Sequence, residues 1–215
     1  MPGLAAVLWA QALAVEGIRE PRRLWLAALI AGVAGGIRIQ TLALTLPTLA
    51  IAMVLQRAWR PALALVAGVV AWAVPLVAAT GGVAGYRAAL ASQAGEDFVW
   101  VDMLWMNPTP RRLALSLYET FALPWSAFPF ARIVLFIAVA GLLVATVRAR
   151  RALALMLVTF VPYLVYHLLF QETITVRYAL PLVPLVAWLA VQGLTLARTA
   201  ALPAAVILEI GRAHV

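Results

Sequence analysis

Long apolar runs, separated by short polar stretches, constrain this chain more than any other feature of its sequence. Each run holds roughly 15–20 residues, close to the length that an α-helix needs to cross the hydrocarbon core of a bilayer. Only helices and closed β-barrels satisfy the backbone inside lipid, and the sequence lacks the ten-residue alternation typical of barrel strands. The sequence therefore predicts an all-α, polytopic integral membrane helical bundle with about seven to eight spans.

Composition and charge support the membrane class. Hydrophobic residues make up 66% of the 215 residues and charged residues only 11%, whereas a soluble domain is about half apolar and about a quarter charged. The formal net charge of +8 comes from arginine without any lysine, which suits a GC-rich bacterial genome. Most arginines lie in short stretches between apolar runs, which indicates membrane orientation rather than nucleic-acid binding. The chain has no cysteine, which excludes a disulfide framework and a thiolate site.

The positions of the arginines predict the orientation of the bundle. Basic turns at 16–23, 56–60 and 148–151 are expected on the cytoplasmic side, because positive charge accumulates there. This arrangement puts the segments 81–119 and 171–178 on the extracytoplasmic face. The predicted location is therefore the bacterial inner (plasma) membrane, with multiple passes.

The segment 24–55 lies between two basic turns and is expected to cross an even number of times, as a hairpin of two short helices or as a re-entrant pair. Arg38 and Gln40 stand near its far turn. An arginine at the centre of a span costs about 2.5–3.5 kcal/mol on insertion scales, so its retention raises a functional hypothesis. Arg38 and Gln40 are expected either to bind an anionic headgroup or to form a plain turn. The nearby glycines of 32–36 predict a small-residue packing face.

The longest polar region, 81–119, is predicted to be an extracytoplasmic loop. Its tryptophan-rich stretch FVWVDMLWM and the basic, amphipathic stretch PRRLALSLYETFALPW both suit the water–lipid interface. The region is interpreted either as a loop lying on the bilayer or as a lid over a lipid-borne substrate. Asp102, a carboxylate among interfacial aromatic residues, is either a substrate contact or an ordinary surface residue.

The stretch QETITVRY at 171–178 combines Glu172, Arg177 and Tyr178 between two apolar runs. A guanidinium at the membrane edge offers a planar fork of donors that suits a phosphate or a carboxylate. Alternatively, Arg177 snorkels to the surface and pairs with Glu172. Pro181 and Pro184 follow at once and are expected to disturb the first turns of the next helix.

His167 lies on the apolar run that leads to this stretch, four residues before Gln171. It is expected either to be a hydrogen-bonded interior residue or to make an acid/base or substrate contact. A single histidine without an HExxH pattern predicts no metal site, and no cofactor is expected. Glycine-rich phosphate loops and serine nucleophile motifs are also absent from the sequence.

Three stretches together resemble the membrane region of the GT-C glycosyltransferases, in particular the family 39 group of dolichyl- or polyprenyl-phosphate-sugar transferases related to ArnT and protein mannosyltransferases. They are MPGLAAVLWAQALAVEG, LWLAALIAGVAGGIRIQTLALTLPTLAIAMVL and RYALPLVPLVAWLA. The last is similar to a late-span RYLLPLLP pattern. The resemblance covers 1–208, whereas EIGRAHV at 209–215 matches a translated sequencing adapter and is expected to be an artefact.

The resemblance implies sugar transfer from a polyprenyl-phosphate-linked donor to a lipid, glycan or protein acceptor at the extracytoplasmic face. Arg177 would stabilise the donor phosphate, and Arg38 would assist. The acidic residue that acts as general base in that family is expected upstream of Met1, so residues 1–208 are expected to be a catalytically incomplete fragment. The competing hypothesis is a secondary transporter or flippase for an anionic or lipid-linked solute, although no internal repeat is evident.

Overall fold

The computed structural model describes residues 2–100, 103–125 and 128–195, and within these ranges every regular element is a helix. The chain divides into two compact units. The first comprises Met1–Asn107 and Leu157–Glu172, and the second comprises Pro108–Met156 and Thr173–Val215. Helix α8 (Arg150–Phe170) contributes residues to both units. The all-helical class predicted from the apolar runs is confirmed for the described part of the chain.

Four helices are long and apolar enough to cross a membrane, which supports a membrane protein. They are Pro61–Ala79, Phe128–Arg148, Arg150–Phe170 and Val176–Thr195. The prediction of seven to eight spans exceeds what the described residues contain. The reason is length: α1, α2 and α3 have 16, 15 and 14 residues, or about 21–24 Å at 1.5 Å per residue, against a hydrocarbon core of about 30 Å.

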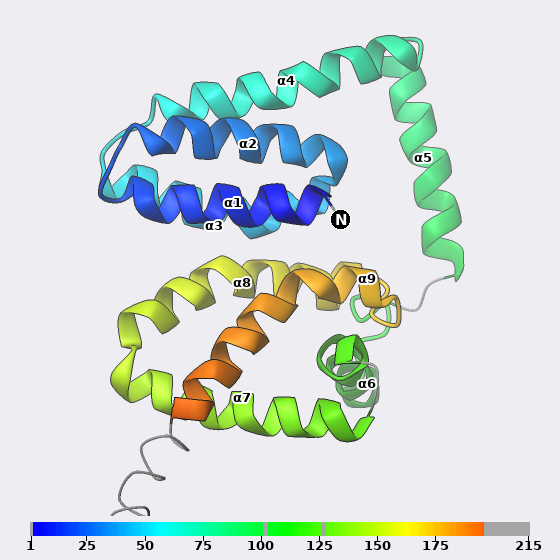
Figure 1. Ribbon diagram of the computed structural model, residues 1–215. Coiled ribbons are helices and arrows are strands. Elements are labelled where there is room, and N and C mark those ends of the chain that lie inside the picture. Colours follow the sequence, from blue (N-terminus) through cyan, green and yellow to red (C-terminus); the bar gives the residue numbers. More distant parts are fainter. Residues whose placement is uncertain (1, 101–102, 126–127, 196–215) are drawn as a thin grey trace, which may run out of the picture. The chain divides into compact units, whose positions relative to one another are not determined.

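The first unit is built around α1 (Pro2–Gly17), α2 (Arg23–Ile37), α3 (Leu42–Leu55) and α4 (Pro61–Ala79), which run alongside one another (Figure 1). Small side chains dominate its core and let the backbones approach closely. The core comprises Ala10, Leu13, Ala14, Leu24, Ala27, Ala28, Ala31, Leu49, Ala52 and Met53. Thr48 of α3 and Thr159 of α8 share a buried hydrogen bond of 2.7 Å.

Glycines make the contact between α2 and α4 possible. A Cβ atom added to Gly32 would lie 2.3 Å from the carbonyl oxygen of Leu65 and 3.0 Å from the Cα of Gly68. The indole Nε1 of Trp72 donates a 3.0 Å hydrogen bond to the carbonyl of Gly32. The small-residue packing face predicted from the glycines of 32–36 agrees with this contact.

The region predicted as a loop, 81–119, contains two helices. Gly81 and Gly82 have φ of +81° and +89°, which glycine tolerates without steric cost, and α4 turns sharply into α5 (Gly82–Trp100) at this point (Figure 1). After Pro108, α6 (Pro110–Phe121) begins with Pro110 in its first turn and with Thr109 as its cap. Helices inside this segment are compatible with an extracytoplasmic connection between spans, which stays a prediction. Alanine and leucine favour helix in both stretches.

The second unit contains α6, the short η2 (Leu123–Trp125), α7 (Phe128–Arg148), the first residues of α8, and the segment that follows Thr173. That segment forms α9 (Val176–Ala179), the 3₁₀ turn η3 (Leu180–Leu182) and a helix over 183–195. The tight η3 turn contains Pro181, as expected from the prolines after the polar stretch. Gly141 of α7 and Gly193 meet so closely that a Cβ on Gly141 would lie 1.7 Å from the carbonyl oxygen of Leu189.

Candidate functional site

Arg177 lies on the surface of the second unit, at the beginning of the candidate span Val176–Thr195. Its Nη2 donates a 3.2 Å hydrogen bond to the hydroxyl of Tyr178, and its Cζ lies 5.0 Å from the centroid of the Tyr178 ring. No carboxylate among the described residues of the second unit forms an ion pair with Arg177. The pairing with Glu172 stays a prediction, because Glu172 belongs to the first unit. Within the second unit, the Tyr178 ring supports the guanidinium.

A buried polar cluster anchors the start of this turn to α6. The hydroxyl of Thr173 donates to Glu119 Oε2 and lies 3.4 Å from Ser116 Oγ. We call Ser116, Glu119 and Thr173 the Glu119 cluster. Ser116 and Thr173 are 0% exposed and Glu119 is 5% exposed. A second contact, from the backbone N–H of Tyr178 to the carbonyl of Thr175 at 2.9 Å, closes the turn.

Helix α6 buries polar side chains and exposes apolar ones. Ser116, Glu119 and Thr120 are buried, whereas its apolar residues Leu113, Leu115, Leu117 and Tyr118 are exposed by 38–44%. A helix on a soluble protein buries its apolar face and exposes its polar face. The reversed arrangement suits a helix whose outer surface contacts lipid and whose polar side chains satisfy one another inside.

Sequence reasoning missed the Glu119 cluster as a site. Glu119 counted only as one of several negative charges in the region 81–119, and Thr173 had no assigned role. The spacing of Ser116 and Glu119, three residues apart, puts both side chains on one face of a helix. That shared polar face on an otherwise apolar helix was the available signal, but its partner lies 54 residues away.

His167 is fully buried in α8. Its Nδ1 lies 2.9 Å from Gln171 Oε1, and its ring is parallel to that of Tyr163 at a centroid distance of 6.2 Å. The Tyr163 hydroxyl also approaches Gln171 Oε1 at 3.5 Å. This environment agrees with the interior, hydrogen-bonded interpretation of His167. A substrate contact at His167 stays a prediction.

Two further predicted residues lie in one turn of the first unit. Arg38 and Gln40 are partly exposed in the turn between α2 and α3, which includes η1 (Ile39–Thr41). The carbonyl of Arg38 accepts a 2.6 Å hydrogen bond from Thr41 Oγ1. This hairpin was predicted from the basic turns that flank it.

The predicted residues belong to both units. Arg38, Gln40, His167 and Glu172 belong to the first unit, whereas Arg177 and Tyr178 belong to the second. Asp102 lies outside the described residues. Within the described ranges, no group of three or more acidic or histidine side chains could hold a metal ion.

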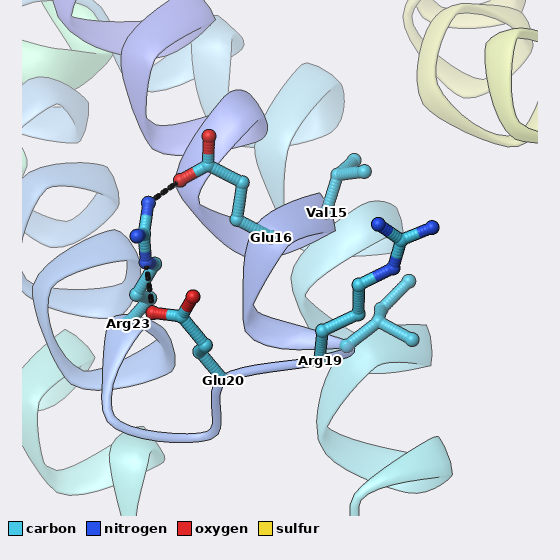
Figure 2. Close-up of a pocket in the computed structure, with 6 residues that line it drawn as sticks. Val15, Glu16, Arg19, Glu20 and Arg23 are labelled. Atoms are coloured by element: carbon cyan, nitrogen blue, oxygen red, sulfur yellow. Dashed lines mark hydrogen bonds and ion pairs between the residues drawn. The ribbon is translucent and has the colours of Figure 1, made fainter.

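A pocket of about 490 Å³ lies where α1 meets α2, and none of the predicted site residues lines it. Its lining residues are Val15, Glu16, Ile18, Arg19, Glu20 and Arg23. Arg23 donates from Nε to Glu20 at 2.6 Å and from Nη1 to Glu16, and Figure 2 shows Arg19 directed away from this network. The hydrogen bonds to Glu20 and Glu16 raise the pKa of Arg23 above its ordinary value.

No family model, no curated protein sequence and no solved structure matches this chain. Its function must therefore be inferred from the chemistry of its own residues.

Proposed function

We propose that this chain is the membrane region of a GT-C-type glycosyltransferase. The enzyme transfers a sugar from a polyprenyl-phosphate donor to a lipid, glycan or protein acceptor on the extracytoplasmic face of the bacterial inner membrane. The observation that carries the proposal is the exposed guanidinium of Arg177, which rests on Tyr178 at the beginning of an apolar helix. The resemblance of RYALPLVPLVAWLA to the late-span pattern of that family gives the same residue the same role.

The proposed role of Arg177 is to bind the phosphate of the lipid-linked donor. When the bond between the anomeric carbon and the phosphate oxygen breaks, negative charge grows on the departing polyprenyl phosphate. A guanidinium that is already oriented stabilises this charge, and two of its N–H groups match two phosphate oxygens. The acceptor hydroxyl forms the new bond to the anomeric carbon and loses its proton to a general base.

The Glu119 cluster supports this role by holding the turn that carries Arg177. Thr173 is fully buried and bonded to Glu119, so the backbone four residues before Arg177 is fixed to α6. Glu119 is itself a buried acceptor and has no proposed contact with the donor. It is a positioning residue in this mechanism.

The decisive experiment measures sugar transfer from a polyprenyl-phosphate donor by the membrane-inserted protein. We expect Arg177→Ala to lower the rate about 100-fold or more, the size of effect seen when a charge-stabilising donor is removed. Arg177→Lys should recover part of the rate, because lysine keeps the charge but loses the planar fork.

Arg132→Ala is the matched control for Arg177→Ala. Arg132 is also exposed, belongs to the same unit and lies over an aromatic ring, with its Cζ 4.0 Å from the Phe128 centroid. The Arg132 variant should retain transfer within a few-fold of the parent. Normal transfer by the Arg177→Ala variant would remove the phosphate-binding role.

A transporter or flippase is the second candidate, and one observation favours it. Pro47, Pro75 and Pro162 lie inside α3, α4 and α8, and helices interrupted by proline are typical of solute sites in secondary transporters. Movement of a fluorescent lipid-linked anion across proteoliposomes that contain only this protein, without any sugar transfer, would select the second candidate.

A further inference from the structure

Two turns lie together at one end of the first unit. The turn between α1 and α2 and the turn between α3 and α4 are joined by a hydrogen bond from Gln56 Nε2 to the carbonyl of Ile18. We call the segments 16–23 and 56–60 the basic end. Five arginines and two glutamates give it a net charge of +3. Four of these arginines are exposed: Arg19, Arg22, Arg57 and Arg60.

The negative charges of the basic end are already occupied. Glu16 and Glu20 both accept hydrogen bonds from Arg23, so these three side chains form a closed network on one side of the pocket. Arg19 lies on the other side, and no carboxylate among the described residues pairs with it (Figure 2). The positive charge left over is therefore available to an outside anion.

The pocket has the size of a small-molecule site, and four of its six lining residues are charged. Its volume of about 490 Å³ falls within the range of about 300–1,000 Å³ typical of ligand pockets. Val15 and Ile18 give it an apolar part, and Arg19 gives it a cation. This lining suits a ligand that has both an anionic group and an apolar part.

Arg57 provides a second, independent observation. Its φ of +49° puts it in the left-handed region, at the position after α3 where glycine is the usual residue. The hydrogen bonds from Ala58 N to Met53 O, 2.9 Å, and from Arg57 N to Val54 O, 3.0 Å, are those of a Schellman motif. A non-glycine residue in this strained backbone conformation suggests that its side chain has a function.

The neighbourhood of Arg57 suits the headgroup region of a bilayer. Trp59 is 62% exposed, and Leu55 and Leu63 on either side of the turn are 60% and 67% exposed. Indole rings collect at the membrane–water interface, next to the apolar surface that contacts the acyl chains. The exposed arginines of the basic end thus lie beside exposed apolar groups that suit a lipid surface.

From these observations we propose that the basic end binds an anionic phospholipid. The phosphate occupies the pocket beside Arg19, Arg57 and Arg60 attract the headgroup, and the acyl chains lie along the apolar side chains that flank the turns. Guanidinium and phosphate are well matched, and a compact cluster of arginines at a membrane surface attracts anionic lipid. The proposal uses none of the residues assigned to donor binding and does not depend on sugar transfer.

The test measures lipid retained by the purified full chain in neutral detergent, by native mass spectrometry, after incubation with phosphatidylglycerol or phosphatidylcholine. We expect the protein to retain phosphatidylglycerol preferentially. Arg19→Gln and Arg57→Gly should each weaken this binding about fivefold, the effect of one basic residue near an anionic surface. Arg87→Gln, which removes an exposed arginine of α5 in the same unit, should leave retention unchanged.

Arg57→Gly separates lipid binding from folding. Glycine relieves the strain at φ +49°, so this variant should unfold at a higher temperature than the parent while it binds less lipid. Equal retention of both lipids would overturn the proposal, as would parental retention by the Arg19 and Arg57 variants or an equal loss in the Arg87 control. Displacement of the lipid by inorganic phosphate at the same concentration would instead assign the pocket to free phosphate.

Discussion

Both units pack helices together through pairs of glycines, but they differ in whether their charged side chains are buried or exposed. In the first unit Gly32 meets Gly68, and in the second Gly141 meets Gly193, each pair at a contact between helix backbones. Small residues allow such close packing, which is the main source of helix association where lipid removes the hydrophobic driving force. The glycine contacts in both units suit helices that pack together in the same environment, a lipid bilayer.

The charged groups differ in burial. The first unit keeps Glu16, Glu20 and Arg23 at the surface, with side-chain exposures of 42–63%, whereas the second unit buries Glu119 against Thr173. Exposed ion pairs contribute little to stability because water screens them. A buried polar group depends on its partner, since loss of the partner leaves it without water or a hydrogen bond. Similar side chains are therefore expected to matter little in one unit and strongly in the other.

The largest expected effect tests what the units share. Gly141→Leu and Gly32→Leu should each lower the free energy of unfolding by about 3 kcal/mol or more, because the added side chain meets backbone atoms that cannot move aside. Thermal unfolding of the detergent-solubilised protein, followed by size-exclusion chromatography, measures the change.

Two valines on the same helices serve as controls for the glycine variants. Val139→Leu in α7 and Val33→Leu in α2 enlarge side chains that are 60% and 46% exposed, and should change little. If leucine is tolerated at Gly141 but not at Gly32, the two helix contacts are not equivalent and the comparison fails.

A smaller effect is expected where the units differ, at the Glu119 cluster. Glu119→Ala should lower the free energy of unfolding by about 1–3 kcal/mol, because the hydroxyl of Thr173 is left buried without its acceptor. Glu119→Gln should lose less, since the amide retains an oxygen that accepts from Thr173. Equilibrium unfolding monitored by tryptophan fluorescence would give both values. Equal stability of the alanine variant and the parent would show that the Glu119 cluster does not stabilise the fold.

The smallest effect is expected at the surface network of the first unit. Arg23→Gln removes both ion pairs, yet the unfolding midpoint should stay within measurement error, and any small change should disappear at high salt. Denaturation at two ionic strengths checks this expectation. A large loss of stability that persists in high salt would mean that the pocket beside Arg23 contributes more to the fold than its exposure indicates.

The helical class and the short hairpin could be predicted because both depend on runs of apolar residues between basic turns. The number of spans could not, since α1, α2 and α3 are apolar but too short, and composition alone does not record where a helix ends. The amphipathic pattern of PRRLALSLYETFALPW, which begins within 81–119, agrees with helix α6. Helix α5 was not predicted, and its alanine-rich sequence follows helix propensity.

The candidate site could be predicted only where its residues are neighbours in the sequence. Arg177 and Tyr178 are adjacent, so their association needed no tertiary information. The contact between Glu119 and Thr173 joins segments that are 54 residues apart, and a single sequence does not predict such a tertiary contact. Burial of a carboxylate on an amphipathic helix also opposes the usual rule for soluble proteins, which directs acidic residues outward.

The exposed leucines of α6 predict that surrounding lipid is a structural component of the second unit. In water, the exposed leucines of α6 would favour rotation of the helix, which would hydrate Glu119 and release Thr173. Harsh delipidation should then loosen the chain just before Arg177 while the glycine-packed helices remain intact. A bilayer that contacts the exposed side of this twelve-residue helix would thereby keep Arg177 in position.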